Sequence, residues 1–114
     1  MTTCIFCDII AGKVPATILY QDEQVTAFRD THPVARTHVL VIPNHHLASL
    51  NDLATTDLGL AGHLVLTAQK IARQEGVDGS GYRLIINTGR DGGQTIHHLH
   101  VHVIGGKHVR FPIG

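Results

Sequence analysis

Three histidines alternate with hydrophobic residues near the C-terminal end of the chain. Residues 98–103 are His-Leu-His-Val-His-Val. Successive side chains of a strand point to opposite faces, so His98, His100 and His102 are expected on one face, about 6–7 Å apart along the backbone. Imidazole titrates near neutral pH, binds metals and attacks electrophiles, and histidine is not a residue that strands favour. The pattern therefore predicts a chemical role rather than an ordinary half-buried strand.

Two chemical roles fit these histidines. They could ligate one metal ion, or one imidazole could attack phosphorus while its neighbours orient it and stabilise charge. The segment just before them is Asp91-Gly92-Gly93-Gln94-Thr95. Glycine lets backbone N–H groups approach a phosphate closely, and the two polar side chains can hydrogen-bond an oxyanion. This loop favours the nucleophile.

Two cysteines, Cys4 and Cys7, form a CxxC motif. The motif is compatible with half of a zinc site, a redox dithiol or two buried thiols. The sequence offers no thioredoxin-like frame for a redox pair. A tetrahedral zinc site needs two more ligands, which His98 and either His45 or His46 could supply. We expect a reducing, cytoplasmic environment, because two cysteines make no disulfide scaffold and the N-terminus resembles no secretory signal.

Length and composition exclude several classes of protein. The chain has 114 residues, with 43% hydrophobic and 16% charged residues, which excludes intrinsic disorder and predicts a single domain, 1–114. Nine Lys and Arg residues balance nine Asp and Glu residues, which disfavours a nucleic-acid partner. No apolar run approaches the roughly 18 residues of a membrane span, so no membrane association is expected.

The hydrophobic pattern predicts an α+β fold with a mainly antiparallel five-stranded sheet. One long helix is expected over 56–75, because Leu60, Leu64, Ala68 and Ile71 form an apolar stripe. Thr55 or Thr56 is its expected N-cap, and Gly76 suits the position after its end. A short helix is expected over 5–11, and strands over 17–20, 24–29, 37–42, 81–87 and 96–104.

The sequence resembles the histidine triad (HIT) family, in particular its Hint-type branch. The likeness rests first on His98-Leu99-His100-Val101-His102-Val103 and covers essentially the whole chain. The other matching blocks, in the family's order and spacing, are Cys4-Ile5-Phe6-Cys7, Ile18-Leu19-Tyr20-Gln21-Asp22, Ala27-Phe28-Arg29-Asp30, residues 37–43, Gly81-Tyr82-Arg83, Asn87 and Asp91-Gly92-Gly93-Gln94.

The resemblance implies a hydrolase that binds a purine nucleoside 5′-monophosphate moiety and cleaves at its α-phosphorus, releasing an amine in the Hint-type branch. The middle histidine, His100, would be the nucleophile and form a nucleotidyl-histidine intermediate. His102 would stabilise charge on the phosphate oxygens, and His38 would support the histidine network. Thr95 would relay a proton to the leaving nitrogen.

The resemblance also implies the binding residues. Asp30 would accept hydrogen bonds from both ribose hydroxyls, and Asn87, Gly93 and Gln94 would line the phosphate or ribose site. The base pocket would consist of Phe6, Ile9, Phe28, Thr31 and Leu40. Many family members with a CxxC motif carry a structural zinc ion, which here implies the ligands Cys4, Cys7, His46 and His98.

A homodimer is implied as well, with the sheet continued across it and the C-terminal tail reaching the partner. Three residues depart from the family pattern: His32, His97, where an aromatic residue is usual, and Phe111, where animal members carry Trp. They put the leaving-group preference in doubt. The alternatives are a dinucleoside polyphosphate hydrolase or nucleotidyl transferase of the same fold, a nucleotide-binding protein with little turnover, and a hydrolase with zinc on all three strand histidines.

Overall fold

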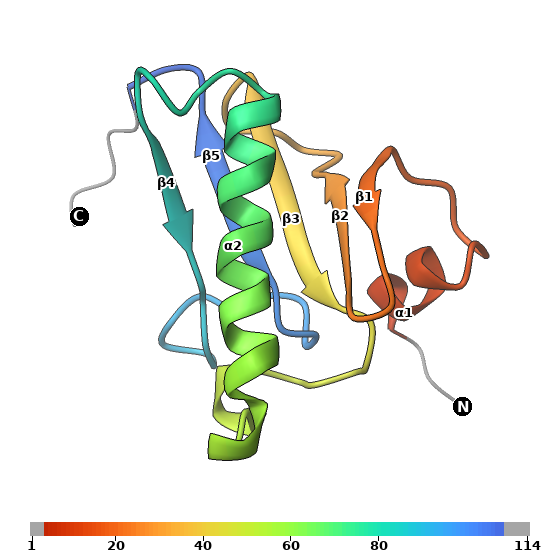
Figure 1. The fold of residues 1–114 in the computed structure, drawn as a ribbon. Helices are drawn as coiled ribbons and strands as arrows, with labels where there is room; N and C mark the ends of the chain where they lie inside the picture. The colour runs from red at the N-terminus through yellow and green to blue at the C-terminus, as the bar shows by residue number, and fades with distance from the viewer. Residues whose placement is uncertain (1–3, 109–114) are drawn as a thin grey trace.

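Five antiparallel strands form one sheet in the order β1-β2-β3-β5-β4 in the computed structural model, which describes residues 4–108 (Figure 1). The α+β fold expected from the sequence is confirmed. The strands are β1 (Ile18–Gln21), β2 (Val25–Arg29), β3 (Thr37–Pro43), β4 (Tyr82–Ile85) and β5 (Val101–Gly105). Every residue of the central β3 is buried, as its run of β-branched and apolar residues predicts.

The long helix α2 (Leu58–Gln74) covers one face of the sheet (Figure 1). Its stripe of Leu64, Ala68 and Ile71 is buried against Val and Ala side chains from β2, β3 and β5. Gly76 follows the helix with φ of 73°, as predicted. The expected threonine cap is wrong: a 3-10 turn (Thr55–Asp57) precedes α2, and the N-cap position is Asp57, which caps no helical N–H.

A short helix, α1 (Ile5–Ile10), packs on the opposite face of the sheet, because its partners in β2 and β3 alternate with the residues that face α2. Its buried side chains, Phe6 and Ile9, join Phe28, Leu40 and Ile42 in a second apolar cluster. The Cys4 thiol caps this helix by accepting a hydrogen bond from the Cys7 backbone N–H at 3.4 Å. The sheet therefore separates a larger core under α2 from a smaller one under α1.

The last strand begins at Val101, not at residue 96 as predicted. Pairing with β3 ends where Val41 faces Val101; the same register would next pair Ile42 with His100 and then Pro43 with Leu99. Pro43 has no N–H to donate to a strand partner. Its carbonyl oxygen instead contacts His98 Nε2 at 2.8 Å, and the Leu99 N–H donates to the Leu47 carbonyl at 2.7 Å. Residues 96–100 therefore lie outside the ladder, while Leu99, Val101 and Val103 still share the core under α2.

Other predicted features differ by a few residues or lie outside residues 4–108. β4 ends at Ile85 rather than at residue 87, and the Asn87 side chain donates to the Gly92 carbonyl at 2.7 Å. Phe111 and the tail predicted to reach a partner subunit fall outside the described residues. Within residues 4–108, no helix combines the length and the apolar character that spanning a membrane requires.

Candidate active site and metal centre

The rings of Phe6, His100 and His102 pack edge to face on the side of the sheet that carries α1. The His100 ring centroid lies 5.0 Å from that of His102, at an interplanar angle of 66°. It lies 5.3 Å from the Phe6 ring at 89°. His102 pairs with Leu40 of β3, a residue of the smaller core. The alternation in the sequence thus places both imidazoles on the face opposite α2.

Two backbone carbonyls determine the tautomers of His98 and His100. A carbonyl oxygen only accepts hydrogen bonds, so the ring nitrogen that faces it carries the proton. His98 Nε2 lies 2.8 Å from the Pro43 carbonyl, which leaves the lone pair of His98 on Nδ1. His100 Nδ1 lies 2.6 Å from the His98 carbonyl, which leaves the lone pair of His100 on Nε2. His100 is therefore oriented as a nucleophile.

The neighbouring pair, His38 and His102, is oriented from the other side. The Val34 N–H donates to His38 Nδ1 at 3.2 Å, so a neutral His38 carries its proton on Nε2. That nitrogen lies 2.9 Å from His102 Nδ1 and 3.4 Å from Asp30 Oδ2. His102 Nδ1 accepts a hydrogen bond from the N–H of His38, and a neutral His102 then carries its own proton on Nε2. These contacts leave a lone pair on Nε2 of a neutral His100 and an N–H on Nε2 of a neutral His102.

Burial keeps this pair of rings neutral. It lowers the pKa of His102 to about 4, and the nearby His100 and His38 add to the shift by charge repulsion. Burial also lowers the pKa of His38, although the Asp30 carboxylate opposes the change. Both rings are neutral at pH 7, so their hydrogen bonds follow the tautomers given above.

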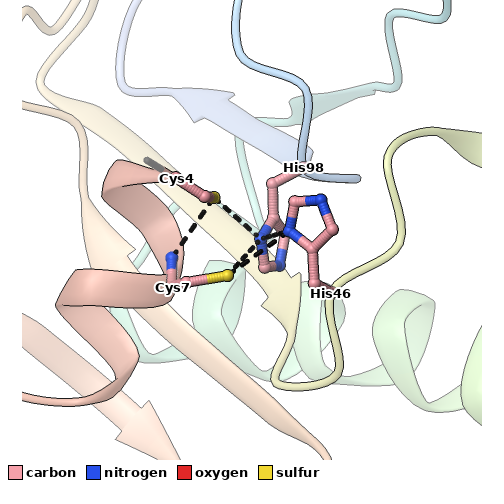
Figure 2. Close-up of side chains that lie close together, drawn as sticks. All are labelled: Cys4, Cys7, His46 and His98. Carbon is pink, nitrogen blue, oxygen red and sulfur yellow. Dashed lines mark hydrogen bonds between the residues drawn. The ribbon is translucent and has the colours of Figure 1, made fainter. Parts of the chain in front are cut away.

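Four potential metal ligands lie close together (Figure 2). They come from α1 and the residue before it (Cys7 and Cys4), from the loop after β3 (His46) and from the segment before β5 (His98). Cys4 Sγ lies 3.4 Å from His98 Nδ1, and Cys7 Sγ lies 3.3 Å from His46 Nδ1. The two Nδ1 atoms are 3.1 Å apart. All four ligand atoms lie within 4.8 Å of one another.

The donor set fits a tetrahedral zinc ion. Zinc bonds of about 2.3 Å to sulfur and about 2.0–2.1 Å to nitrogen place tetrahedral ligand atoms roughly 3.3–3.8 Å apart, close to these separations. The lone pair of His98 is already on Nδ1, the nitrogen that faces the cysteines. Without a cation, burial and then the Cys4 thiol raise the pKa of Cys7 to about 11. A divalent cation reverses this preference, because the thiolate is the ligand.

A pocket of about 380 Å³ opens beside α1. Thr95, predicted as a proton relay, lines it together with six of the residues predicted for the nucleotide site, namely Phe6, Ile9, Phe28, Asp30, Thr31 and Leu40. The pocket is apolar at its α1 side and polar where Asp30 and Thr31 follow β2. Asp30 Oδ1 accepts from the His32 N–H at 2.8 Å, so a turn holds this carboxylate in position.

Three other predicted residues, Asn87, Gly93 and Gln94, do not line this pocket. They lie in the loop after β4, and their polar groups bind one another or the backbone. The buried Gln94 side chain donates to the carbonyls of Ala48 and Ile96 at 2.7 and 3.0 Å, and it accepts from the Gly89 N–H at 3.0 Å. Gln94 thus secures the loop that the resemblance places at the phosphate site.

Sequence reasoning missed part of the pocket wall. The additional lining residues are Ile5, Val14, Pro15, Ala16, Arg29, His32 and Ile96. Most are small or apolar and carry no chemical signal that marks a binding residue. His32 is the exception, because it departs from the family pattern, although no binding role was predicted for it from the sequence.

Fold and site together define an α+β domain in which a cluster of histidines lies beside a mainly apolar pocket. The HIT domain family model matches residues 11–109. The chain belongs to this family of histidine triad proteins, as the sequence resemblance indicated. The match excludes α1 and the CxxC motif, so the metal ligands of the N-terminus rest on the geometry above.

Individual relatives agree with this assignment. A purine nucleoside phosphoramidase from Escherichia coli K12 is 48% identical over 110 residues, which cover 96% of this chain and 89% of that protein. A HIT family hydrolase from Legionella pneumophila superposes with a TM-score of 0.94 at 41% identity, covering 98% of this chain and all of the other. A zinc-bound histidine triad family protein from Mycobacterium smegmatis has a TM-score of 0.80 at 33% identity, covering 92% and 76%.

Proposed function

We propose that this protein is a nucleotide-binding hydrolase that cleaves nucleoside 5′-phosphoramidates and related adenosine monophosphate conjugates at the α-phosphorus. The observation that carries the proposal is the His100 ring, whose lone pair on Nε2 is set by the His98 carbonyl at 2.6 Å. The same ring contacts Phe6, which lines the pocket. The similarity to the E. coli phosphoramidase supports a P–N bond as the bond that breaks.

The reaction has two steps. In the first, the lone pair of His100 Nε2 attacks the α-phosphorus, the P–N bond to the leaving group breaks, and the amine departs after gaining a proton. Thr95 lines the pocket and is exposed, so its hydroxyl can donate a proton to the leaving nitrogen and take a replacement proton from solvent water. In the second step water attacks the nucleotidyl-histidine, releasing the nucleoside monophosphate and restoring the ring. The N–H of His102 stabilises the charge that develops on the phosphate oxygens in both steps.

The binding residues follow from the pocket. Apolar side chains of α1 and of strands β2 and β3 would pack against a purine base, and the Asp30 carboxylate would accept from the ribose hydroxyls. The loop 88–94 would present backbone N–H groups to the phosphate, with Gln94 holding it in place. Asn87 would reach the same site through its contact with Gly92.

We also propose a structural zinc ion on Cys4, Cys7, His46 and His98. The supporting observations are the convergence of the four ligand atoms and the zinc-bound relative from M. smegmatis. When bound, zinc crosslinks α1 to two distant segments and takes no part in the reaction. Two thiols free of a disulfide also agree with a reducing, cytoplasmic location.

A homodimer completes the proposal. Within residues 4–108, α2 exposes Leu58, Val65 and Leu66, with 78%, 49% and 54% of their surface accessible. β4 is an edge strand next to this helix, and Ile86 just beyond it is 39% exposed. Apolar side chains gathered on a helix beside an open strand edge are typical of a subunit interface.

The nucleophile is tested by amine release from adenosine 5′-phosphoramidate. We expect His100→Ala to lower kcat/KM by at least about a thousandfold, whereas His97→Ala, at an exposed neighbour, should stay close to wild type. Wild-type protein quenched with a slowly hydrolysed adenylate should carry an adenylyl mass increment on the peptide that contains His100. Near-normal turnover by His100→Ala contradicts the mechanism, and faster cleavage of diadenosine polyphosphates contradicts the proposed leaving group.

A further inference from the structure

The helix α1 takes part in two sites at once. Cys4 and Cys7, at its start and in its first turn, are potential zinc ligands. Between them, Phe6 projects into the smaller core and lines the pocket, and Ile5 and Ile9 line the pocket as well. One wall of the proposed nucleotide site is therefore a helix whose two cysteines face a metal centre.

This helix is too short to be stable by itself. It has six residues, whereas isolated helices shorter than about 12–15 residues are marginal in water. Its described anchors are the Cys4 cap, the buried Phe6 and Ile9, the partly buried Ile10 and the four-ligand cluster. The position of α1 thus depends strongly on contacts with the rest of the domain, and a bound metal would add the strongest of them.

Phe6 connects the two sites directly. Its ring lies edge to face on three others: 5.9 Å from His98, a potential metal ligand, 5.3 Å from His100, the proposed nucleophile, and 5.3 Å from Phe28 of the pocket. His98 also supplies the carbonyl that orients His100. A change in how α1 and His98 are held would therefore alter both the pocket wall and the ring next to the substrate phosphorus.

We propose that zinc binding at Cys4, Cys7, His46 and His98 and nucleotide binding in the pocket strengthen each other through α1. The inference rests on the nucleotide-binding function proposed above. A metal that orders α1 lowers the entropic cost of nucleotide binding, because the pocket wall is already fixed. A nucleotide that packs on Phe6 likewise fixes α1, and this holds the two cysteines in place for the metal. Linkage requires the two effects to be equal. We expect each ligand to tighten the other by about tenfold, within the usual range of such couplings.

The coupling is tested with adenosine monophosphate and Zn²⁺ on the full chain. Metal is removed with a chelator under reducing conditions, and circular dichroism verifies that the sheet remains. Calorimetry then gives the nucleotide Kd with and without zinc, and competition with a chromophoric chelator gives the zinc Kd with and without nucleotide. We expect both ratios to be about ten and equal within error. Equal nucleotide affinities in the two forms overturn the coupling.

Two variants distinguish an effect of the bound metal from the effect of replacing a nearby histidine. His46→Ser removes a ligand in a loop that does not line the pocket, so its nucleotide affinity should match the metal-free protein and ignore added zinc. His45→Ser changes the adjacent exposed histidine and should keep the zinc response. A zinc response retained by His46→Ser overturns the proposal. If neither form of the wild type binds adenosine monophosphate, the nucleotide function itself fails, whereas binding of equal strength refutes the coupling alone.

Discussion

At the scale of single residues, the active site depends on which nitrogen of each ring carries a proton. Three backbone groups make that choice, namely the Pro43 and His98 carbonyls and the Val34 N–H. Their effect reaches His102 only through His38, whose Nε2 lies 2.9 Å from His102 Nδ1. In the proposed mechanism His38 is thus a positioning residue, because it leaves the N–H of His102 free to face the phosphate.

Replacing His38 should separate this positioning role from a role in folding. His38→Leu removes the donor to His102, so we expect kcat/KM for adenosine 5′-phosphoramidate to fall about tenfold to a hundredfold. His38→Gln offers an amide N–H to the same nitrogen and should recover part of the loss. Nitrogen-15 NMR of the histidine rings should show His102 protonated on Nε2 in the wild type. A wild-type His102 protonated on Nδ1 would refute the assignment.

At the scale of elements, the loop after β4 shows where sequence reasoning succeeded and where it failed. The Gly-rich segment was correctly expected to be a loop beside the histidines, because glycine and aspartate favour turns. The use of Gln94 was not predictable: its amide binds Ala48, which lies 46 residues away in sequence. Local patterns do not report such contacts, whereas the alternation of residues 98–103 reports the two faces of the chain directly.

The predicted boundaries of helices and strands were wrong where they depend on contacts that are distant in sequence. The segment before β5 bonds instead to the Pro43 carbonyl and to Leu47, contacts far away in sequence that no feature of residues 96–100 themselves reveals. The pocket wall from Val14 to Ala16 was missed because small apolar residues look alike in a core and in a binding site. The four residues expected at a zinc site do converge, although Cys4 and His98 are 94 positions apart. Cysteine and histidine are chemically distinctive candidates, and the family resemblance selected His46 over His45.

Gly92 should be indispensable to the loop. A Cβ added there would lie 2.3 Å from the Thr88 carbonyl oxygen, which is backbone and cannot rotate away. We expect Gly92→Ala to shift the loop, to destabilise the fold by about 1–3 kcal/mol and to weaken nucleotide binding. Gly79→Ala is the matched control, because a Cβ at Gly79 meets no atom within 4 Å. Urea denaturation and calorimetry with adenosine monophosphate measure the two effects, and equal behaviour of the two variants would contradict the expectation.

At the scale of the whole molecule, neutral buried imidazoles make stability depend on pH. The folded-state pKa of His102 is about 4, against about 6.5 in an unfolded chain, mainly because of burial. Between these values the unfolded chain binds a proton that the native protein does not. The free energy of unfolding should therefore be largest above pH 6.5 and fall as the pH is lowered toward 4.

Urea denaturation from pH 7.5 to 4.5, in the presence of a chelator, measures this dependence. We expect the midpoint to fall steadily below pH 6.5, since burial lowers the pKa of His38 and His98 in the same direction. His102→Gln should reduce the slope. His97→Gln is the control for removing an imidazole at an exposed position. A midpoint that rises on acidification would have the wrong sign for buried neutral histidines.

The exposed apolar face of α2 sets the expected assembly. Leu66 is 54% exposed in the middle of the helix, on the side that does not contact the sheet. A glutamate there would have to be desolvated in an interface, so Leu66→Glu should convert a dimer into a monomer. Leu50→Glu is the matched control, because Leu50 is 42% exposed but lies in a 3-10 turn (Leu50–Asp52) outside α2.

Light scattering coupled to size-exclusion chromatography, at several protein concentrations, distinguishes the dimer from the monomer. A monomeric wild type, or a dimer that survives Leu66→Glu, would rule out α2 as the interface, because an apolar contact centred on this side chain cannot tolerate a buried charge.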